Sequence, residues 1–151
     1  MSELSIVKLD DSAAASELAQ GVAEQFVLPT FSEEGRSTFP KILARDVVAG
    51  FSDPDVEIFG VRTEERLVGY IAIARKTHIS QLFVAADQQQ KGIGRMLLDF
   101  VEQRAKAFGV SQLTVRASLN AVPFYKKCGF EVTADAQEKA GIRFQPMQKT
   151  L

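Results

Sequence analysis

The chain has 151 residues, of which 46% are hydrophobic and 25% charged, a composition typical of one globular domain with one core. Its 18 basic and 19 acidic residues leave a net charge of -1, which excludes an overall positive field that would attract nucleic acid or an anionic membrane. One cysteine and one histidine exclude an internal disulfide and a His/Cys metal cluster. We therefore expect a single domain over residues 1–151 without metal.

The predicted elements alternate between helical and strand patterns, which indicates a mixed α/β domain. Asp11-Ser12 is a cap for the first helix, Ser32 for the second, and Pro40 starts or kinks the later part of that second helix. In chain order we expect a strand at 4–9, a helix at 12–26, a helix from 32 to about 51, antiparallel strands at 56–62, 66–75 and 78–85 with a turn at 63–65, a helix from 92 to 109, a strand at 111–117, a short helix at 120–129, and strands at 130–134 and 142–149.

The first residues lack the basic start and apolar stretch of a secretory signal. No later segment approaches the ~20 apolar residues that cross a bilayer. These features predict a cytoplasmic protein without a membrane partner, either a monomer or a homodimer.

The junction between the third antiparallel strand and the long helix has the composition of an anion site. In "FVAADQQQKGIGRMLL", Phe83 to Leu98, a helix that begins at Gly92 points its first-turn amides and positive dipole end back toward the loop. Glycine at 92 and 94 keeps Cβ atoms out of the way of an anion. Two glycines also simply permit a tight turn. The further side-chain donors are Gln89, Gln90, Lys91 and Arg95.

The spacing of this junction excludes two common phosphate motifs. A dinucleotide fingerprint needs a third glycine where Leu97 stands, and a P-loop places its lysine after the second glycine, whereas Lys91 precedes both. What remains is the pattern Q-x-x-G-x-G, formed by Gln89, Gly92 and Gly94.

This pattern resembles the acetyl-CoA pyrophosphate loop of the GCN5-related N-acetyltransferase (GNAT) superfamily. A second segment, "NAVPFYKKCGF" from Asn120 to Phe130, resembles the helix that follows in that superfamily. Two motifs in the right order make the resemblance specific, and it covers roughly residues 56–130. It implies a GNAT-like fold, in which a mostly antiparallel central sheet is splayed between its fourth and fifth strands and flanked by about four helices.

The resemblance also implies an acetyl-CoA-dependent N-acetyltransferase that transfers acetyl directly to a primary amine of a small molecule or peptide. Backbone groups near Leu82 to Val84 are expected to hold the pantetheine arm and polarise the thioester carbonyl. A module that binds acyl-CoA or another nucleotide without turnover stays open as a different class. The residues that the resemblance assigns to acetyl-CoA are Leu82, Phe83, Val84, Gln89, Gln90, Lys91, Gly92, Ile93, Gly94, Arg95, Asn120 and Phe124.

Acetyl transfer to an amine with a pKa of ~10.4 needs a proton acceptor, because only about one amine in 2,500 is neutral at pH 7. His78 stands where some branches of the superfamily carry a glutamate, and strand periodicity places positions 78, 80, 82 and 84 on one face. Its ordinary pKa of ~6.5 suits a general base. A structural histidine is the alternative, with water relayed to a backbone carbonyl or to Glu57 as the base.

The departing thiolate needs a proton donor. Tyr125 falls on the superfamily tyrosine that is assigned as general acid, and packing beside Phe124 is the alternative explanation for it. A covalent acyl-enzyme would use Cys128 with His78, but Cys128 precedes the helix-stopping Gly129 and is expected to be a small buried apolar residue.

The acceptor pocket is expected between the early helices, around residues 27–39, and the last strands, around residues 136–144. Phe31 and Phe39 can form an apolar slot there, with Glu33 and Glu34 as carboxylates for a cationic amine. A normal solvated helix start explains the same residues. The sequence does not identify the acceptor.

Overall fold

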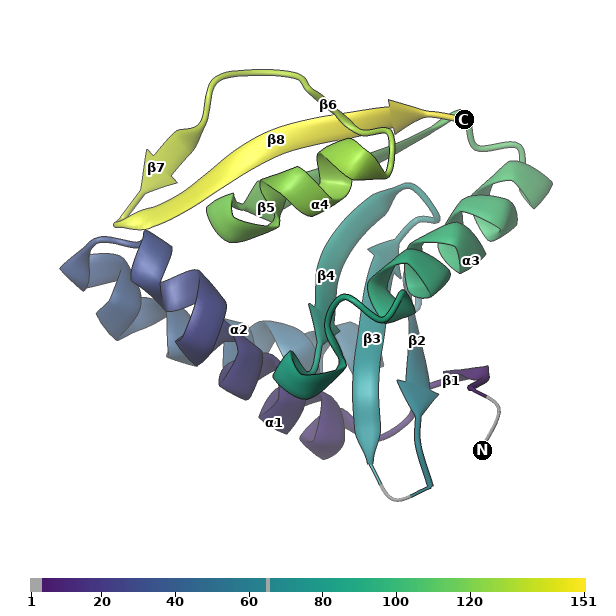
Figure 1. Cartoon of the computed structure of the whole chain (residues 1–151), viewed down its shortest axis with the longest axis horizontal. Helices are drawn as coiled ribbons and strands as arrows, with labels where there is room; N and C mark the ends of the chain where they lie inside the picture. Colours follow the sequence, from purple (N-terminus) through teal and green to yellow (C-terminus); the bar gives the residue numbers. More distant parts are fainter. Residues whose placement is uncertain (1–3, 65) are drawn as a thin grey trace.

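The computed structural model describes residues 4–64 and 66–151, and Figure 1 shows its helices and strands. The turn predicted at 63–65 includes Glu65, which lies outside the described residues. In chain order the elements are β1 (Ile6–Lys8), α1 (Ser12–Val22), α2 (Glu33–Ser52), β2 (Val56–Arg62), β3 (Leu67–Ala74), β4 (His78–Val84), α3 (Ile93–Ala107), β5 (Gln112–Ser118), α4 (Val122–Lys127), β6 (Glu131–Val132), β7 (Gln137–Lys139) and β8 (Ile142–Thr150), with short π and 3-10 segments at Ala23–Val27, Leu28–Thr30, Ala86–Gln88 and Leu119–Ala121.

The strands form one mixed sheet in the order β1-β2-β3-β4-β5-β8-β6, with β7 paired to β8. Every pairing is antiparallel except that of β4 with β5, which are parallel. These two strands are paired only at His78 with Thr114 and at Ile79 with Val115, and they separate beyond that point. The predicted splay between the fourth and fifth strands is therefore confirmed, as is the GNAT-like fold class.

Two hydrophobic cores cover the two faces of the sheet. One joins the sheet to α3 and α4 and contains, among others, Leu97, Val115 and Tyr125, all of them buried. The other joins the sheet to α1 and α2 and contains Ala19, Leu43 and other buried residues. Figure 1 shows α3 lying over the β2–β4 half of the sheet and α4 lying over β5 and β8.

A bulge interrupts β4 at its start. Ala72 on β3 pairs with Gln81, but the next residue, Ile73, pairs with Ile79, so Ser80 has no opposite residue. Ile79 consequently belongs to the same core as Leu82, three residues further on. An uninterrupted strand would have put these two side chains on opposite faces.

Two details of the predicted elements are wrong. Helix α2 is continuous from Glu33 to Ser52, so Pro40 lies inside it and does not start its later part; the alternative, a kink at Pro40, stays a prediction. The Pro40 carbonyl accepts a 2.7 Å hydrogen bond from Gln20 Nε2, which ties α1 to α2. The strand β7 was missed because its side chains are all exposed and carry no apolar alternation; pairing with β8 alone makes it a strand.

The β7–β8 hairpin closes against the start of α2. The amide of Ser32 donates a 3.1 Å hydrogen bond to the carbonyl of Gly141, and Arg143 donates from Nη1 to the Thr30 carbonyl at 3.0 Å. A Cβ atom built on Gly35 would overlap the carbonyl group of Gly141. Glycine at position 35 therefore lets the hairpin and the helix meet backbone to backbone.

Candidate active site

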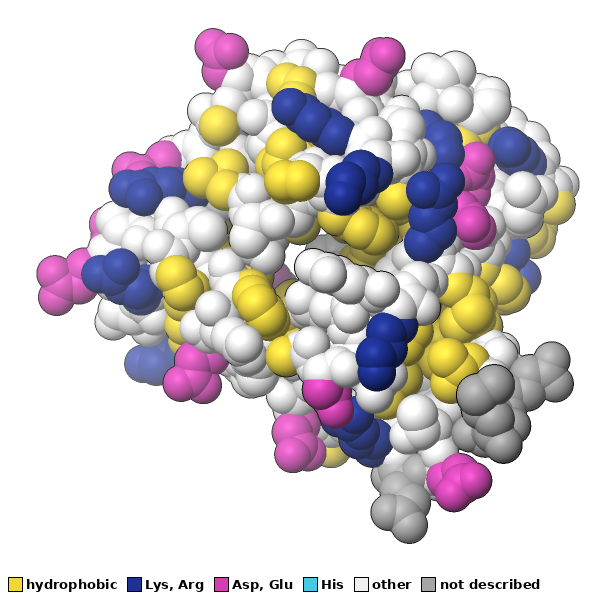
Figure 2. All heavy atoms as spheres, viewed as in Figure 1, with side chains coloured by type: hydrophobic (Ala, Val, Ile, Leu, Met, Phe, Trp, Pro, Cys, Tyr) yellow, Lys and Arg dark blue, Asp and Glu magenta, His cyan; other side chains and the backbone are white. Residues whose placement is uncertain are grey.

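A cavity of about 400 Å³ lies where β4 and β5 separate. β4 contributes its residues from His78 to Phe83, and β5 contributes those from Val115 to Ser118. Helix α2, α4 and the first residues of β8 complete the walls. Figure 2 shows the surface hollowed between the two halves of the molecule.

The cavity runs from one face of the sheet to the other. Tyr125, which lines it, belongs to the core under α3 and α4, whereas Phe31 and Leu43, which line it too, belong to the core under α1 and α2. Since β4 and β5 are not paired here, side chains from both faces meet in one space. Such a passage suits a reaction between two substrates that approach from opposite sides.

The loop before α3 has the geometry of an anion site. Gly92 caps the helix in the left-handed conformation, with φ of 84°, and a Cβ atom there would meet nothing within 4 Å. The amide of Met96 makes the first helical bond, 2.9 Å to the Gly92 carbonyl, so the amides of Ile93, Gly94 and Arg95 have no acceptor within the helix. These three N–H groups and the open space at Gly92 fit a diphosphate.

The side chains around this loop differ in what they offer. Gln89 donates from Nε2 to the Val84 carbonyl at 3.0 Å, so this side chain ties the loop to β4, and its role as a donor to phosphate stays a prediction. Gln90 and Lys91 are exposed, and Gln90 has a positive φ of 62°. The Ile93 side chain is buried, which leaves only its backbone to an anion.

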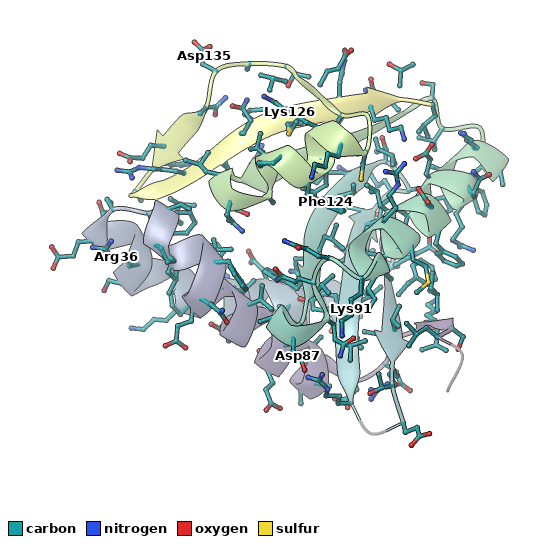
Figure 3. All side chains as sticks on the ribbon, in the orientation of Figure 1. Arg36, Asp87, Lys91, Phe124, Lys126 and Asp135 are labelled. Atoms are coloured by element: carbon teal, nitrogen blue, oxygen red, sulfur yellow. The ribbon has the colours of Figure 1, made fainter. Side chains whose placement is uncertain are left out.

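Helix α4 meets the start of α3 through Phe124. A Cβ atom on Gly94 would lie 3.2 Å from the Phe124 ring, tighter than ordinary packing. Figure 3 labels Phe124 and Lys126 on α4 and Lys91 on the loop across the opening. Lysine and arginine side chains gather on this face around the same opening in Figure 2. Asn120, expected to contact acetyl-CoA, is exposed on the turn before α4 and does not line the cavity.

Tyr125 combines a buried ring with a place in the cavity wall. Only 4% of the residue is exposed, and its ring packs edge-on against Phe124 and Phe130. Burial, and to a lesser degree Cys128, raises the pKa of Tyr125 well above its ordinary value. The phenol therefore stays protonated at neutral pH.

His78 is half-buried at the end of the cavity where β4 and β5 are still paired. Its Nδ1 lies 2.8 Å from the hydroxyl oxygen of Thr114. Burial, then the charges of Arg116 and Arg75, lowers the pKa of His78, so the ring is neutral over more of the pH range. The bulge corrects the expectation that His78 shares a face with Leu82 and Val84, because Ile79 takes that face. His78 accordingly lies on the α2 side of the sheet.

The remaining residues from the sequence analysis divide between wall and surface. Phe31 and Phe39 line the cavity and pack edge to face with centroids 5.1 Å apart, while the exposed Glu33 and Glu34 are not in its wall. Cys128 is buried in the core beside Phe130, as expected of a small apolar residue, and burial raises the pKa of its thiol. Glu57 is bound to Arg104 of α3 and does not line the cavity.

Sequence reasoning missed several residues of the wall. Arg116 lies on β5 among alternating buried residues, so strand periodicity alone would have placed it opposite Val115 and toward the α2 side. Arg143 and Phe144 belong to the last-strand segment 136–144 that was expected to border the acceptor pocket, whereas Asp46 gave no such signal, because it enters the wall through the packing of α2 on the sheet.

Among residues 4–64 and 66–151, no group of three or more His, Cys, Asp or Glu side chains is placed to hold a metal ion. Within the same residues no helix has the length and apolar character that crossing a membrane requires.

Comparisons with known proteins agree with this geometry. A family model described as an acetyltransferase (GNAT) domain matches residues 27–151. A GCN5-related N-acetyltransferase from Rhodopseudomonas palustris is 25% identical, with a TM-score of 0.86 over 100% of this chain and 98% of its own. The PaiA N-acetyltransferase from Thermoplasma acidophilum, solved with coenzyme A, is 23% identical, with a TM-score of 0.74 over 99% of this chain and 100% of its own.

A third similar structure is an aminoglycoside 6'-N-acetyltransferase in complex with coenzyme A, 14% identical, with a TM-score of 0.67 over 97% of this chain and 96% of its own. The family model spans most of the chain, and the splayed sheet and anion loop agree with it. The chain therefore belongs to the GNAT acetyltransferase family and is an N-acetyltransferase that uses acetyl-CoA as its acetyl donor.

Proposed function

We propose that this enzyme transfers acetyl directly from the CoA thioester to a primary amine while both substrates are bound. The observation that carries the proposal is the cavity that joins the two faces of the sheet, with Tyr125 in its wall on one side and His78 on the other. Acetyl-CoA occupies the α3–α4 side, with its diphosphate on the first-turn amides of α3. The amine of a small molecule or peptide enters from the α2 side.

Each step of the proposed reaction can then be assigned to a group of this chain. The amine loses its proton to His78, directly or through one water, and attacks the thioester carbon. A backbone N–H of β4 near Leu82 to Val84 stabilises the oxyanion, and the C–S bond breaks as Tyr125 gives its proton to the thiolate. A water relayed to a backbone carbonyl is the competing base for the first step.

Direct transfer is favoured over an acyl-enzyme because the single cysteine is buried in the α3–α4 core and does not line the cavity. Burial also keeps its thiol protonated and weakly nucleophilic. Intact-mass measurement after incubation with acetyl-CoA alone tests this point. We expect no acetylated enzyme, and acetyl on Cys128 would overturn direct transfer.

The proposal extends to residues 1–151 acting as one N-acetyltransferase domain, in the cytoplasm, where acetyl-CoA is available, as a monomer or homodimer. Cell fractionation and light scattering test the location and the oligomeric state. Recovery of the protein in a fraction other than the cytoplasm would contradict the proposed location.

The test of the activity itself separates transfer from binding alone. Calorimetry should give saturable acetyl-CoA binding, and a thiol reagent should then detect CoA release that depends on an added amine. Saturable binding without amine-dependent release across a broad amine panel favours the alternative, a domain that binds acyl-CoA as a sensor. Absence of binding would contradict both.

A further inference from the structure

The acceptor side of the cavity holds a guanidinium group, that of Arg116, for which residues 4–64 and 66–151 supply no ion-pair partner. Arg116 lines the cavity from β5, and none of the ion pairs or side-chain hydrogen bonds within residues 4–64 and 66–151 involves it. Its guanidinium carbon lies 5.6 Å from the centroid of the Phe144 ring. The ring supports the group, while its N–H donors stay available.

Arg116 points to the side of the sheet from which the amine approaches. Its neighbours Val115 and Ala117 are buried in the core under α3 and α4, so alternation along β5 turns Arg116 toward the opposite face. That is the face of α2 and of His78, and the positive charge of Arg116 helps to lower the pKa of His78. The guanidinium thus stands beside the candidate base rather than beside the donor loop.

The other charged groups of the wall already have partners. Arg143 donates from Nε to Glu138 and from Nη1 to the Thr30 carbonyl, so its fork is largely used in holding the hairpin. Asp46 lies 3.5 Å from Arg45 and belongs also to an adjoining cavity of about 270 Å³. Asp46, the carboxylate of this wall, therefore forms its ion pair with Arg45 and none with Arg116.

A purely cationic acceptor fits this wall poorly, because Arg116 repels an ammonium group close to the candidate base. A carboxylate on the acceptor reverses that repulsion, since the planar fork of arginine pairs with carboxylate through two parallel hydrogen bonds. Phe39, Ile42 and Phe144 also line the cavity and offer apolar surface for the body of the molecule.

We propose that the acceptor is a small amine that also carries a carboxylate, and that Arg116 binds this carboxylate during acetyl transfer. The inference rests on the proposed function, because it assigns the acceptor of the same site. It adds a specificity-determining residue and a chemical class to an otherwise unspecified amine.

The experiment compares acceptors of the same skeleton with and without the negative charge. The pairs are 6-aminohexanoate with 6-aminohexanamide, in which the amine is far enough from the change to keep its pKa, and L-leucine and L-phenylalanine with their amides. We expect kcat/KM for the acid of at least one pair to exceed that for its amide by ten- to a hundredfold, the order of magnitude of a charge-assisted pair. In Arg116→Gln this preference should fall to about one.

Arg75→Gln is the matched control. Arg75 also lowers the pKa of His78, but it does not line the cavity, so its loss should leave the acid-over-amide ratio unchanged. The acetyl-CoA dissociation constant should be the same in both variants and the wild type. Any of three results would overturn the proposal. The acid-over-amide ratio could be at or below one in every pair, or it could be unchanged in Arg116→Gln. Arg116→Gln could instead weaken the binding of acetyl-CoA.

Binding keeps this inference distinct from the proposed activity. Calorimetry of the same acids and amides is made on protein saturated with CoA. If acetyl-CoA binds but no amine releases CoA, the transfer activity fails while acid-selective binding that needs Arg116 still supports the acceptor class. If CoA is released from amines but no acid outbinds its amide, the activity stands and the carboxylate assignment fails.

Discussion

The imidazole Nδ1 of His78 lies 2.8 Å from the Thr114 hydroxyl, and the same two residues are register partners on β4 and β5. They form the outermost of the two residue pairs that join these strands before the sheet opens. When Nδ1 carries the proton and donates it to Thr114, Nε2 is left unprotonated as the nitrogen that can accept a proton. The bond that holds the strands together thus also orients the candidate base.

Replacing His78 by Gln should lower kcat/KM at pH 7 by about 10²-fold, the contribution typical of a general base. In the wild type the rate should rise with pH as His78 deprotonates, at a pH below the ordinary histidine value because burial, Arg116 and Arg75 lower its pKa. The variant should lose this limb of the pH profile. A limb that persists in His78→Gln would mean that another group, such as a relayed water, is the base.

The same pKa can be followed without turnover. The chain has one histidine, so its ring proton signal in an NMR titration is unambiguous. Arg116→Gln and Arg75→Gln should each raise the pKa of His78 toward its ordinary value, since each removes a positive charge that opposes protonation. A pKa unmoved by both substitutions would show that burial alone accounts for the shift.

Replacing Tyr125 by Phe should lower kcat by about 10²-fold and leave acetyl-CoA affinity nearly unchanged, because the hydroxyl acts on the leaving thiolate. Tyr70 is a matched control: it is the other tyrosine, equally buried, and its hydroxyl bonds to Gln81. Tyr70→Phe should reduce thermal stability but retain kcat per folded molecule. Equal kcat losses in both variants would indicate a packing role for Tyr125.

Replacing Gly94 by Glu should weaken acetyl-CoA binding by at least tenfold in calorimetry. The new side chain meets Phe124 and brings a negative charge to the three free amides of α3. A carboxylate in the first turn of a helix is itself favourable, so the dipole gives no reason for unfolding. Gly21→Glu, at an exposed position on α1 with open space, is the control and should bind normally. Unchanged affinity in Gly94→Glu would reject the anion loop.

Substitutions at two glycines of α2 distinguish the effect of hairpin docking from that of helix propensity. Gly35→Ala should destabilise the fold by about 1–3 kcal/mol, an overpacking cost, because its Cβ overlaps the Gly141 carbonyl, and should raise the acceptor KM while acetyl-CoA affinity holds. Gly50→Ala meets only side chains at 3.6 Å or more and should be neutral or stabilising by up to about 1 kcal/mol. Thermal unfolding and initial rates measure both. A stabilised Gly35→Ala would contradict the docking contact.

Local patterns predicted the order of the elements because the long helix has a regular apolar period and the strands are short apolar runs separated by turns. Helix α3 and the antiparallel strands β2 to β4 are examples, and the GNAT resemblance supplied the splay. The bulge at Ser80 was out of reach, since it depends on how β3 and β4 pair and no residue of β4 marks it. Its effect was large, because one extra residue moved His78 to the opposite face from Leu82.

The sequence predicted only those parts of the site that one contiguous segment forms. The loop from Gln89 to Arg95 carries its own spacing, so its position before α3 followed from the sequence. The hydrogen bond from the Gln89 side chain to the Val84 carbonyl did not follow from the sequence, because it depends on how the loop folds back onto β4. The acceptor wall joins α2, β5 and β8, which meet only in the folded sheet, so Arg116 was not assigned to it beforehand, although the last-strand segment that contains Phe144 was expected there.

Because the space between β4 and β5 opens to both faces of the sheet, each product has an exit of its own. Under the proposed function, CoA would withdraw past α3 and α4 and the acetylated amine would leave past α2, so neither product would obstruct the other. Release in no fixed order follows, and product inhibition by CoA should be competitive against acetyl-CoA alone. A covalent conjugate of CoA and an amine would pass through the space between β4 and β5 and occupy the CoA side and the amine side at the same time.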